Sequence, residues 1–405
     1  MKNKGITIRI KKVGNNKGIT LIALVITIIV LLLLAGITLN LVLGENGIIT
    51  RAKEAKFKAE LVEQEEQDRL LKLNIQMQLA QNEVPEEWKQ SVAEIREQSV
   101  PIPKGFEYLE GSKSIGLVIR DTENQNEFVW VPIEIGSEDS SKQVSNLKGW
   151  YTAKDDQVNT EEYKALVASI YKYGGFYVAR YEATYLEGTG TDGDVSGTDS
   201  ATLSSYKASS VPAKRIATEE YTKQVGDLWN NITYQGAFWA SKNMYLDSDS
   251  VKSNLLYGTQ WDSILHWIQE TDGLKNTEID SDQTTEWKIT TDSKSWGTYY
   301  NSTFQYVDPI TKTEKTKQEN LSELIPTGSS QYTKANNIYD LAGNTFEWTQ
   351  EKGDIGHYRR GGNYLIRGDA YPASKFLVSY DDSRFSYLSF RRRSLYSISK
   401  NNYPY

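Results

Sequence analysis

Four residues within one short segment have the types and the spacing of a cation site. Asp340 and Glu347 supply carboxylates, and Gly343 and Thr345 lie between them in the run Asp-Leu-Ala-Gly-Asn-Thr-Phe-Glu. A tight Gly-Asn turn between two carboxylates can gather oxygen ligands around one hard cation, and calcium takes about 6–8 such oxygens. The alternative is an ordinary turn, in which Asp340 accepts hydrogen bonds from nearby amides. We predict a bound calcium ion.

Other reactive side chains are scarce. The sequence contains no cysteine, which excludes disulfides, thiolate catalysis and Cys-ligated zinc, and its only histidines are His266 and His357. Two separated histidines are a poor supply for a His-rich metal site or a His-based triad. Adjacent carboxylates such as Asp381 and Asp382 usually lie on solvated loops, whereas a glycosidase needs two carboxyl groups at a defined separation across a cleft. We therefore expect no enzymatic activity.

Residues 363–388 have the composition of a recognition surface. Aromatic, aliphatic and charged side chains mix there without a helical or strand period, whereas a core would be patterned. Tyrosine and arginine anchor ligands, and serine and asparagine adapt to them. We predict that an extracellular ligand, protein or glycan, contacts Tyr364, Ile366, Arg367, Asp369, Tyr371, Phe376, Val378, Tyr380, Asp382, Arg384, Phe385 and Tyr387.

The length, net charge and aromatic content of the chain limit the class of protein to which it can belong. A chain of 405 residues has room for two or three domains, and a hydrophobic fraction of 39% allows a packed core. The net charge of −7 argues against nucleic acid as a partner. The 26 tyrosines and 10 tryptophans suit exposed recognition surfaces, with an aromatic core in a loop-rich fold as the alternative.

The N-terminal region predicts a membrane anchor. Residues 1–17 carry lysine and arginine but no acid, and residues 19–43 form a run of 25 residues without a charge. At ~1.5 Å per residue, a helix of this length crosses a ~30 Å hydrocarbon layer. A secretory signal peptide, the alternative, has a shorter apolar region of about 7–15 residues. The cations before the run place the N-terminus in the cytoplasm and the C-terminal domain outside, at the cell surface.

The start of this run resembles the type IV prepilin signal. Gly18 follows the basic stretch and precedes Ile-Thr-Leu-Ile-Ala-Leu-Val. The resemblance implies that a prepilin peptidase cuts after Gly18 and that Ile19 becomes the new terminus. Pilins usually carry a glutamate five residues after the cut, which meets a neighbouring pilin's terminal amine; this chain has Ala23 there. That departure argues against a major pilin and leaves a minor pilin, a tip subunit or a plain membrane anchor.

The rest of the chain divides into a stalk, a linker and an outer domain. An apolar stripe at three-to-four spacing continues through 51–82 as a charged helix, until prolines interrupt it. We predict a leader at 1–18, a transmembrane and stalk helix at 19–83, a linker at 84–104 and an outer domain at 105–405. In the outer domain we expect strands at 128–133 and 174–182 and helices at 232–244 and 261–270. Short runs of this kind, separated by polar loops, indicate a loop-rich α+β domain.

Five motifs of the outer domain resemble, in order, those of the formylglycine-generating enzyme (sulfatase-modifying factor) family. They are Phe128-Val-Trp-Val-Pro, Gly174-Gly-Phe-Tyr-Val-Ala-Arg-Tyr-Glu, Leu256-Tyr-Gly-Thr-Gln-Trp-Asp, Asp340-Leu-Ala-Gly-Asn-Thr-Phe-Glu-Trp and Arg360-Gly-Gly-Asn-Tyr. The resemblance covers roughly residues 105–397 and implies a variant of the C-type lectin fold. Phe390 and Arg391 also match the family's last block, where Arg391 is expected to pair inside the fold.

The resemblance also has implications for two metals, calcium and copper. It implies that Asp340 and Glu347 bind a structural calcium through side-chain oxygens, and that Gly343 and Thr345 bind it through backbone carbonyls. The family's enzymes bind copper with two cysteines, whose places fall at about Ile366 and Tyr371. Neither residue is a soft ligand for Cu(I), so we expect no copper and no formylglycine-forming activity.

Together these features predict a surface-displayed ligand-binding protein of the adhesin or receptor type, with a pilin-like anchor and a non-catalytic lectin-like domain. The alternative is a minor pilin or pseudopilin that acts mainly in filament assembly, in contact with other pilins. The C-terminal segment also resembles that of proteins diversified by retroelements, which rewrite adenines in codons while the fold is retained. The residue types in 363–388 are largely those that such rewriting of AAC-type codons yields. A fixed binding loop is the alternative.

The retroelement hypothesis makes a prediction about DNA. We expect a near-copy of the codons for residues 360–390 close by in the genome, differing only at adenines, because adenine is the base that is rewritten. Sequencing the locus checks this. A locus with neither such a repeat nor a reverse transcriptase would leave a fixed binding loop.

Overall fold

The computed structural model describes residues 100–133, 161–187, 195–198, 203–217, 222–248, 250–274 and 282–396. The chain divides into two compact units, Met1–Glu83 and Val84–Tyr405, and the described residues all belong to the second. Among these residues, no helix is long and apolar enough to cross a membrane. The predicted leader, anchor and stalk, including Gly18, Ile19 and residues 19–43, lie outside the described ranges.

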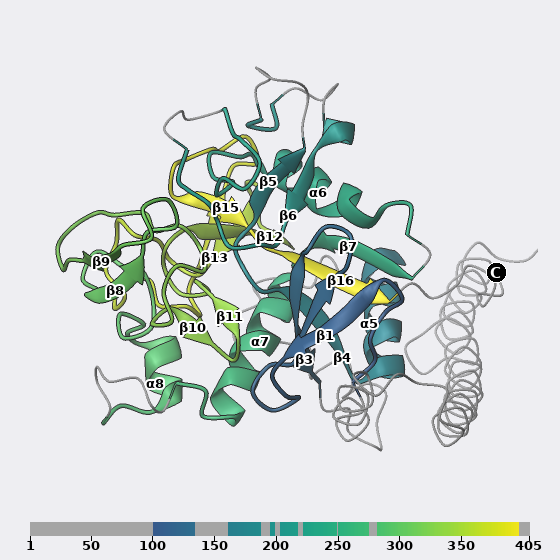
Figure 1. Ribbon diagram of the computed structural model, residues 1–405, viewed down its shortest axis with the longest axis horizontal. Coiled ribbons are helices and arrows are strands. Elements are labelled where there is room, and N and C mark those ends of the chain that lie inside the picture. Colours follow the sequence, from purple (N-terminus) through teal and green to yellow (C-terminus); the bar gives the residue numbers. More distant parts are fainter. Residues whose placement is uncertain are drawn as a thin grey trace, which may run out of the picture. The chain divides into compact units, whose positions relative to one another are not determined.

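The largest sheet joins distant parts of the chain. Its strands are β1 (Phe106–Glu110), β2 (Val118–Asp121), β3 (Glu127–Pro132), β4 (Gly175–Ala179), β7 (Val251–Leu255) and β16 (Arg392–Tyr396). They lie in the order β1-β2-β3-β4-β16-β7, and every neighbouring pair is antiparallel. In Figure 1, β16 (yellow) runs among strands from much earlier in the chain. The apolar runs of β3 and β4 are buried because both faces of the sheet are covered there.

A second sheet carries most of the predicted recognition segment. Its strands are β12 (Phe346–Lys352), β13 (His357–Arg360), β14 (Phe376–Ser379) and β15 (Leu388–Phe390), in the order β14-β13-β12-β15. β12 and β15 are parallel, and the other pairs are antiparallel. β14 was not expected, because its residues show no alternation; it is an edge strand whose first three side chains are half-buried.

In the part of the chain that the structure describes, four helices surround these sheets: α5 (Glu161–Tyr173), α6 (Tyr234–Lys242), α7 (Gly258–Glu270) and α8 (Thr285–Thr290). Two short 3-10 segments, η1 (Leu203–Ser205) and η2 (Asn243–Tyr245), precede and follow α6 in sequence. Thr233 caps α6 by accepting a hydrogen bond from the backbone N–H of Gly236, and Thr284 caps α8 in the same way. Polar residues therefore set where these helices begin.

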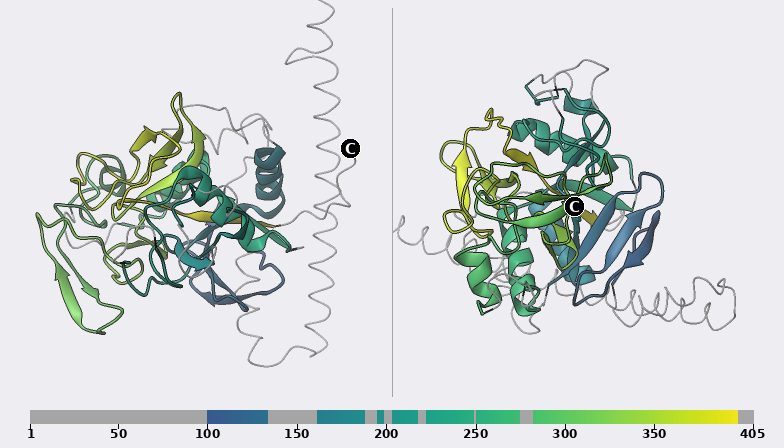
Figure 2. Two further views of the ribbon diagram at one scale, coloured as in Figure 1. Left: turned by 90° about the horizontal axis from the view of Figure 1, so that it is seen from above. Right: turned by 60° about the vertical axis from the view of Figure 1, so that its left-hand side comes forward.

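Three two-stranded ribbons complete the described domain: β5 (Thr184–Glu187) with β6 (Lys207–Ser209), β8 (Phe304–Val307) with β9 (Glu314–Lys317), and β10 (Lys334–Ala335) with β11 (Ile338–Tyr339). Figure 2 shows the β8–β9 ribbon extending away from the rest of the domain. The β10–β11 turn is made by Asn336 and Asn337, both with positive φ, as the primed hairpin turns require.

The coarser part of the predicted fold class is confirmed: the described domain mixes helices and strands and is strand-rich and loop-rich. The expected strands at 128–133 and 174–182 are found as β3 and β4, and the expected helices as α6 and α7. Tryptophans build much of the core, which accords with the aromatic-core alternative. The fully buried ones are Trp130, Trp229, Trp261, Trp296 and Trp348.

Candidate functional site

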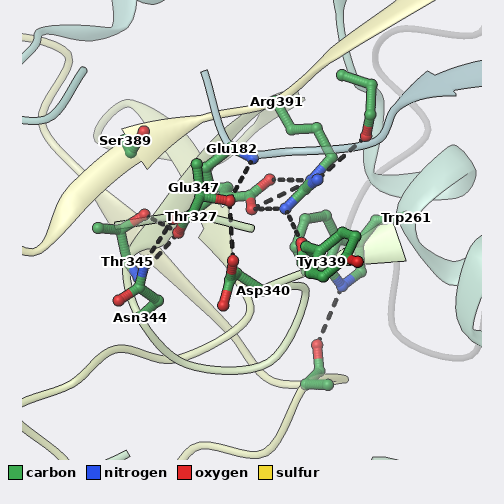
Figure 3. Close-up of polar contacts among 12 residues, drawn as sticks. Glu182, Trp261, Thr327, Tyr339, Asp340, Asn344, Thr345, Glu347, Ser389 and Arg391 are labelled. Atoms are coloured by element: carbon green, nitrogen blue, oxygen red, sulfur yellow. Dashed lines mark hydrogen bonds and ion pairs between the residues drawn. The ribbon is translucent and has the colours of Figure 1, made fainter. Parts of the chain in front are cut away.

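The predicted calcium residues lie in a buried polar cluster (Figure 3). Glu347 of β12 faces Arg391, whose Nε and Nη2 atoms donate to both oxygens of the carboxylate at 2.7–3.2 Å. Arg391 also donates to the carbonyl oxygens of Ala179 at 3.1 Å and Tyr339 at 2.8 Å. Both partners of this ion pair are fully enclosed. The prediction that Arg391 pairs inside the fold is confirmed.

Two further carboxylates belong to the same cluster. Asp340 accepts hydrogen bonds from the Thr327 hydroxyl at 2.8 Å and from the Gly328 N–H at 3.0 Å. Glu182, which was not predicted, accepts from the Asn344 side chain at 2.5 Å and from the backbone N–H and hydroxyl of Thr345. Its partners are more than a hundred residues away in sequence, so no local pattern marks it.

The cluster holds three carboxyl groups and one guanidinium. Burial raises the pKa of Glu182 well above its ordinary value, and the neighbouring Asp340 and Glu347 carboxylates raise it further. Burial likewise raises the pKa of Asp340 and of Glu347, although Arg391 opposes both shifts. Three carboxyl groups around one guanidinium therefore need either protons or a further cation to balance their charge.

The four predicted ligands lie in one short loop, and one of them, Glu347, is already paired with Arg391. Among the described residues, no group of three or more His, Cys, Asp or Glu side chains is placed to hold a metal ion. Arg391 occupies both Glu347 oxygens, and the Thr345 N–H and hydroxyl face Glu182. The loop itself is tightly folded, with positive φ at Asp340, Gly343 and Asn344. Calcium binding stays a prediction, because a metal ion would have to share Glu347 with Arg391.

The predicted recognition residues lie at the surface. Of the side chains named for ligand contact, none is buried: Arg367, Asp369, Tyr380, Asp382 and Phe385 are exposed, and Tyr364, Ile366, Tyr371, Phe376, Val378, Arg384 and Tyr387 are intermediate. Tyr380 is the most open of the large apolar side chains among them, at 62% exposed. The predicted segment is therefore accessible to a ligand.

Residues beneath this segment are buried and hold it in place. Arg360 donates to Asp262 at 3.0 Å and to Glu351 at 2.6 Å, and all three side chains are enclosed. This contact joins two of the sequence motifs, since Asp262 ends the Leu256–Asp262 run. Ile366 and Tyr371, which stand near the family's cysteine positions, pack against the apolar core instead.

A group of aromatic rings lies within the surface. Phe385 and Tyr387 stack with 4.9 Å between ring centroids, and Tyr371 and Tyr387 each meet Phe346 edge-on. The Arg359 guanidinium lies over Phe346 at 4.6 Å, over Tyr387 at 5.6 Å and over Phe385 at 5.9 Å. Neither Phe346 nor Arg359 was predicted as a site residue. Their nearness to the surface follows from the β12–β13 pairing, which no local motif reveals.

A histidine secures the turn that follows β14. His357 bonds the Asp381 carboxylate through Nδ1 at 2.7 Å and stacks on Tyr234, with 3.5 Å between ring centroids. The backbone N–H of Tyr234 in turn donates to the Asp381 carbonyl at 2.9 Å. Asp381 is therefore occupied in positioning the turn, and Asp382 beside it is exposed.

Two hollows are seen elsewhere on the domain. One, of about 990 Å³, lies along the β8–β9 ribbon and residues 327–334, and the other, of about 690 Å³, lies between β1 and η2. Neither is lined by any residue of 363–388. The predicted recognition segment thus presents projecting side chains and lies outside both hollows.

No family model matches the sequence, and no curated protein matches it significantly. Among solved structures, the chain is similar to CarF, with 16% identity and a TM-score of 0.32 over 55% of this chain and 86% of that one. It is similar to PvdO from Pseudomonas aeruginosa, with 11% identity and a TM-score of 0.32 over 69% and 97%. It is also similar to Treponema denticola variable protein 1, with 12% identity and a TM-score of 0.28 over 55% and 95%. At TM-scores below 0.5, these likenesses assign no function.

The buried ion pair generates a prediction about stability. Replacing Arg391 by methionine leaves Glu347 buried without its cation, and loss of one partner of a buried pair costs about 3–5 kcal/mol. We expect Arg391→Met to lower the free energy of unfolding by this amount in urea denaturation. The control is Arg120→Met, which breaks a pair with Glu107 whose side chains are 34% and 38% exposed, and which should change stability little. Equal urea midpoints for the two variants would contradict the central role of Arg391.

Proposed function

We propose that this protein binds an extracellular ligand through the surface formed by residues 364–387, without transforming it. The observation that carries the proposal is the contrast in burial between this surface and its support. The aromatic and charged side chains of 364–387 reach solvent, while Arg360, Arg391 and their carboxylate partners beneath are enclosed. A rigid scaffold under adaptable, Tyr- and Phe-rich contacts is the arrangement that recognition surfaces use.

Binding is favoured over catalysis by the chemistry of the side chains. Thiolate chemistry is excluded, since the sequence has no cysteine. The enclosed carboxylates of the described site are paired with arginines or accept backbone and hydroxyl hydrogen bonds. Asp381 bonds His357, and Asp369 pairs with Arg367 at the surface. These groups serve as structural partners in the proposal. Turnover by the purified protein in a substrate screen would overturn it.

We further propose that the outer domain has a C-type lectin-like fold of the formylglycine-generating enzyme type and is displayed at the cell surface by the pilin-like segment at 19–43. The motif order and the uncharged run support this proposal. A minor pilin that acts in filament assembly is the competing proposal. Protease treatment of intact cells separates a displayed domain, which is cleaved, from an internal one, which is protected.

Calcium generates a prediction. We propose that a calcium ion balances the excess negative charge near Asp340, and we expect calcium chloride to raise the midpoint of thermal unfolding relative to a chelator. Asp340→Asn keeps an oxygen for Thr327 and Gly328 but removes one charge, so it should abolish most of the calcium-dependent shift. Magnesium chloride is the control for ionic strength. Identical midpoints in calcium and chelator would mean that Arg391 and protons alone balance the cluster.

The binding surface itself is tested with two libraries, a phage-displayed collection of short random peptides and a glycan array, each probed with the full-length chain. We expect selected ligands to lose about 30-fold or more in affinity with Tyr380→Ala or Phe385→Ala, because exposed aromatic anchors carry much of the binding energy. Ile310→Ala is the matched control, since Ile310 is 67% exposed but lies in the β8–β9 turn.

Thermal unfolding of the same variants separates contact from folding. The surface variants should unfold at the temperature of the unmodified protein. Variants that unfold early would make these rings part of the core. Full affinity in both surface variants, or no ligand from either library, would overturn the proposed function.

A further inference from the structure

Arg359, on β13 beneath the proposed surface, is a buried cation without a paired anion. Its side chain belongs to a residue only 8% exposed, and its Nε and Nη1 atoms are covered and have no hydrogen-bond partner. Within the described ranges it forms no ion pair. A buried N–H without an acceptor costs about 1–3 kcal/mol, and more where the group is charged. Such a group is rare in a folded protein and needs an explanation.

The other buried arginines of the domain show what Arg359 lacks. Three of them are paired with carboxylates: Arg180 with Glu110 and Glu127, Arg360 with Asp262 and Glu351, and Arg391 with Glu347. The fourth, Arg392, is fully enclosed in the six-stranded sheet and donates to the Asn126 side chain at 2.7 Å, although its Nε and Nη1 atoms also have no hydrogen-bond partner. No ligand can approach Arg392 from the surface. Arg359 differs, because aromatic rings that cover it belong to the exposed segment 364–387.

Aromatic rings hold the Arg359 guanidinium but leave its Nε and Nη1 N–H groups unsatisfied. The faces of Phe346, Phe385 and Tyr387 attract the cation, and such contacts contribute roughly 0.5–2 kcal/mol. A ring face accepts no strong hydrogen bond from the edge of the guanidinium. Burial lowers the pKa of Arg359, and the Tyr387 hydroxyl only partly opposes the shift. The environment therefore leaves the positive charge incompletely compensated.

Two of the three rings that cover Arg359 are partly exposed to solvent. Phe385 is 39% exposed, and Tyr387, stacked on it, is half-buried. Both side chains come from the segment proposed to contact ligand. Rotation of these rings would open the guanidinium to a ligand at a site shielded from water, where a polar contact is most valuable. Phe346 below is 3% exposed and would stay in place.

We propose that Arg359 receives a carboxylate from an aspartate or glutamate side chain of a protein ligand, and is thereby a specificity-determining residue of the surface. This inference rests on the proposed binding function. The chemistry matches, since a guanidinium binds carboxylates through strong, charge-assisted hydrogen bonds. A protein ligand is favoured over a small molecule, because the segment lies outside both described hollows and is rich in Tyr, Phe and Arg.

The experiment uses peptides selected from the phage-displayed library on the full-length chain. Each acidic residue of a selected peptide is replaced in turn by its amide, and dissociation constants are measured by fluorescence polarisation. We expect one acid-to-amide change to weaken binding to the unmodified protein about 10- to 100-fold. The same change should have almost no further effect on Arg359→Met, because the partner of that carboxylate is then missing. Arg120→Met, outside the surface, should behave as the unmodified protein does.

The outcomes separate this inference from the proposed function. If peptides bind through Tyr380 and Phe385 but acid-to-amide changes have equal effects on the unmodified protein and on Arg359→Met, the function stands and the role of Arg359 is overturned. If only uronate- or sialate-bearing glycans of the array bind, the carboxylate comes from a sugar and the protein ligand is overturned. The coupling is a ratio of measured dissociation constants, so it is read only where Arg359→Met still binds the unchanged peptide and unfolds at the temperature of the unmodified protein. If Arg359→Met unfolds early or does not bind, Arg359→Gln takes its place.

Discussion

One enclosed ion pair, Arg391 with Glu347, determines how the two main sheets fit together. Glu347 belongs to β12 of the four-stranded sheet, and Arg391 directly precedes β16 of the six-stranded sheet. The same guanidinium bonds the carbonyl oxygens at Ala179, which ends β4, and at Tyr339 in β11. A buried charge tolerates little displacement, because any gap leaves it both desolvated and unpaired. Four segments distant in sequence are therefore held at one point.

The Arg391–Glu347 ion pair explains why the surface formed by residues 364–387 can be irregular. The loop at 340–345 is fixed from below by Glu182, which bonds Thr345 and Asn344, while Asn344 in turn bonds the backbone of Ile325. Arg360 ties β13 to α7 through Asp262. Because the residues that support it are enclosed and paired, the segment 364–387 remains folded without a regular pattern of its own. The residue types in this segment are therefore not dictated by the needs of folding.

Much of the scaffold could be predicted from the sequence. The apolar runs at 128–133 and 174–182 are strands, and helical spacing located α7, although it begins earlier than expected, at Gly258. The exposure of the 364–387 side chains also followed from their composition. Arg391 and Arg392 are adjacent and charged, yet both are buried, and each finds a polar partner.

The parts that could not be predicted depend on contacts across the fold. Glu182 was not recognised because its partners lie near residue 345, and Arg359 was not recognised because its rings come from β12 and from the end of the recognition segment. β14 forms because β13 offers a partner edge, although its own residues do not alternate. Such features arise when strands from distant segments pair, and the local composition of those segments does not indicate that they will pair.

The position of β16 has a consequence for how the chain is made. It is the last described strand, yet it lies between β4 and β7 and bonds both. Until the ribosome has released it, β4 and β7 each keep an open edge that can pair with a foreign strand. A nascent chain must therefore be shielded, or exported unfolded, until its final residues emerge. A premature stop a few codons before Arg392 would remove the strand that joins β7 to the rest of the sheet.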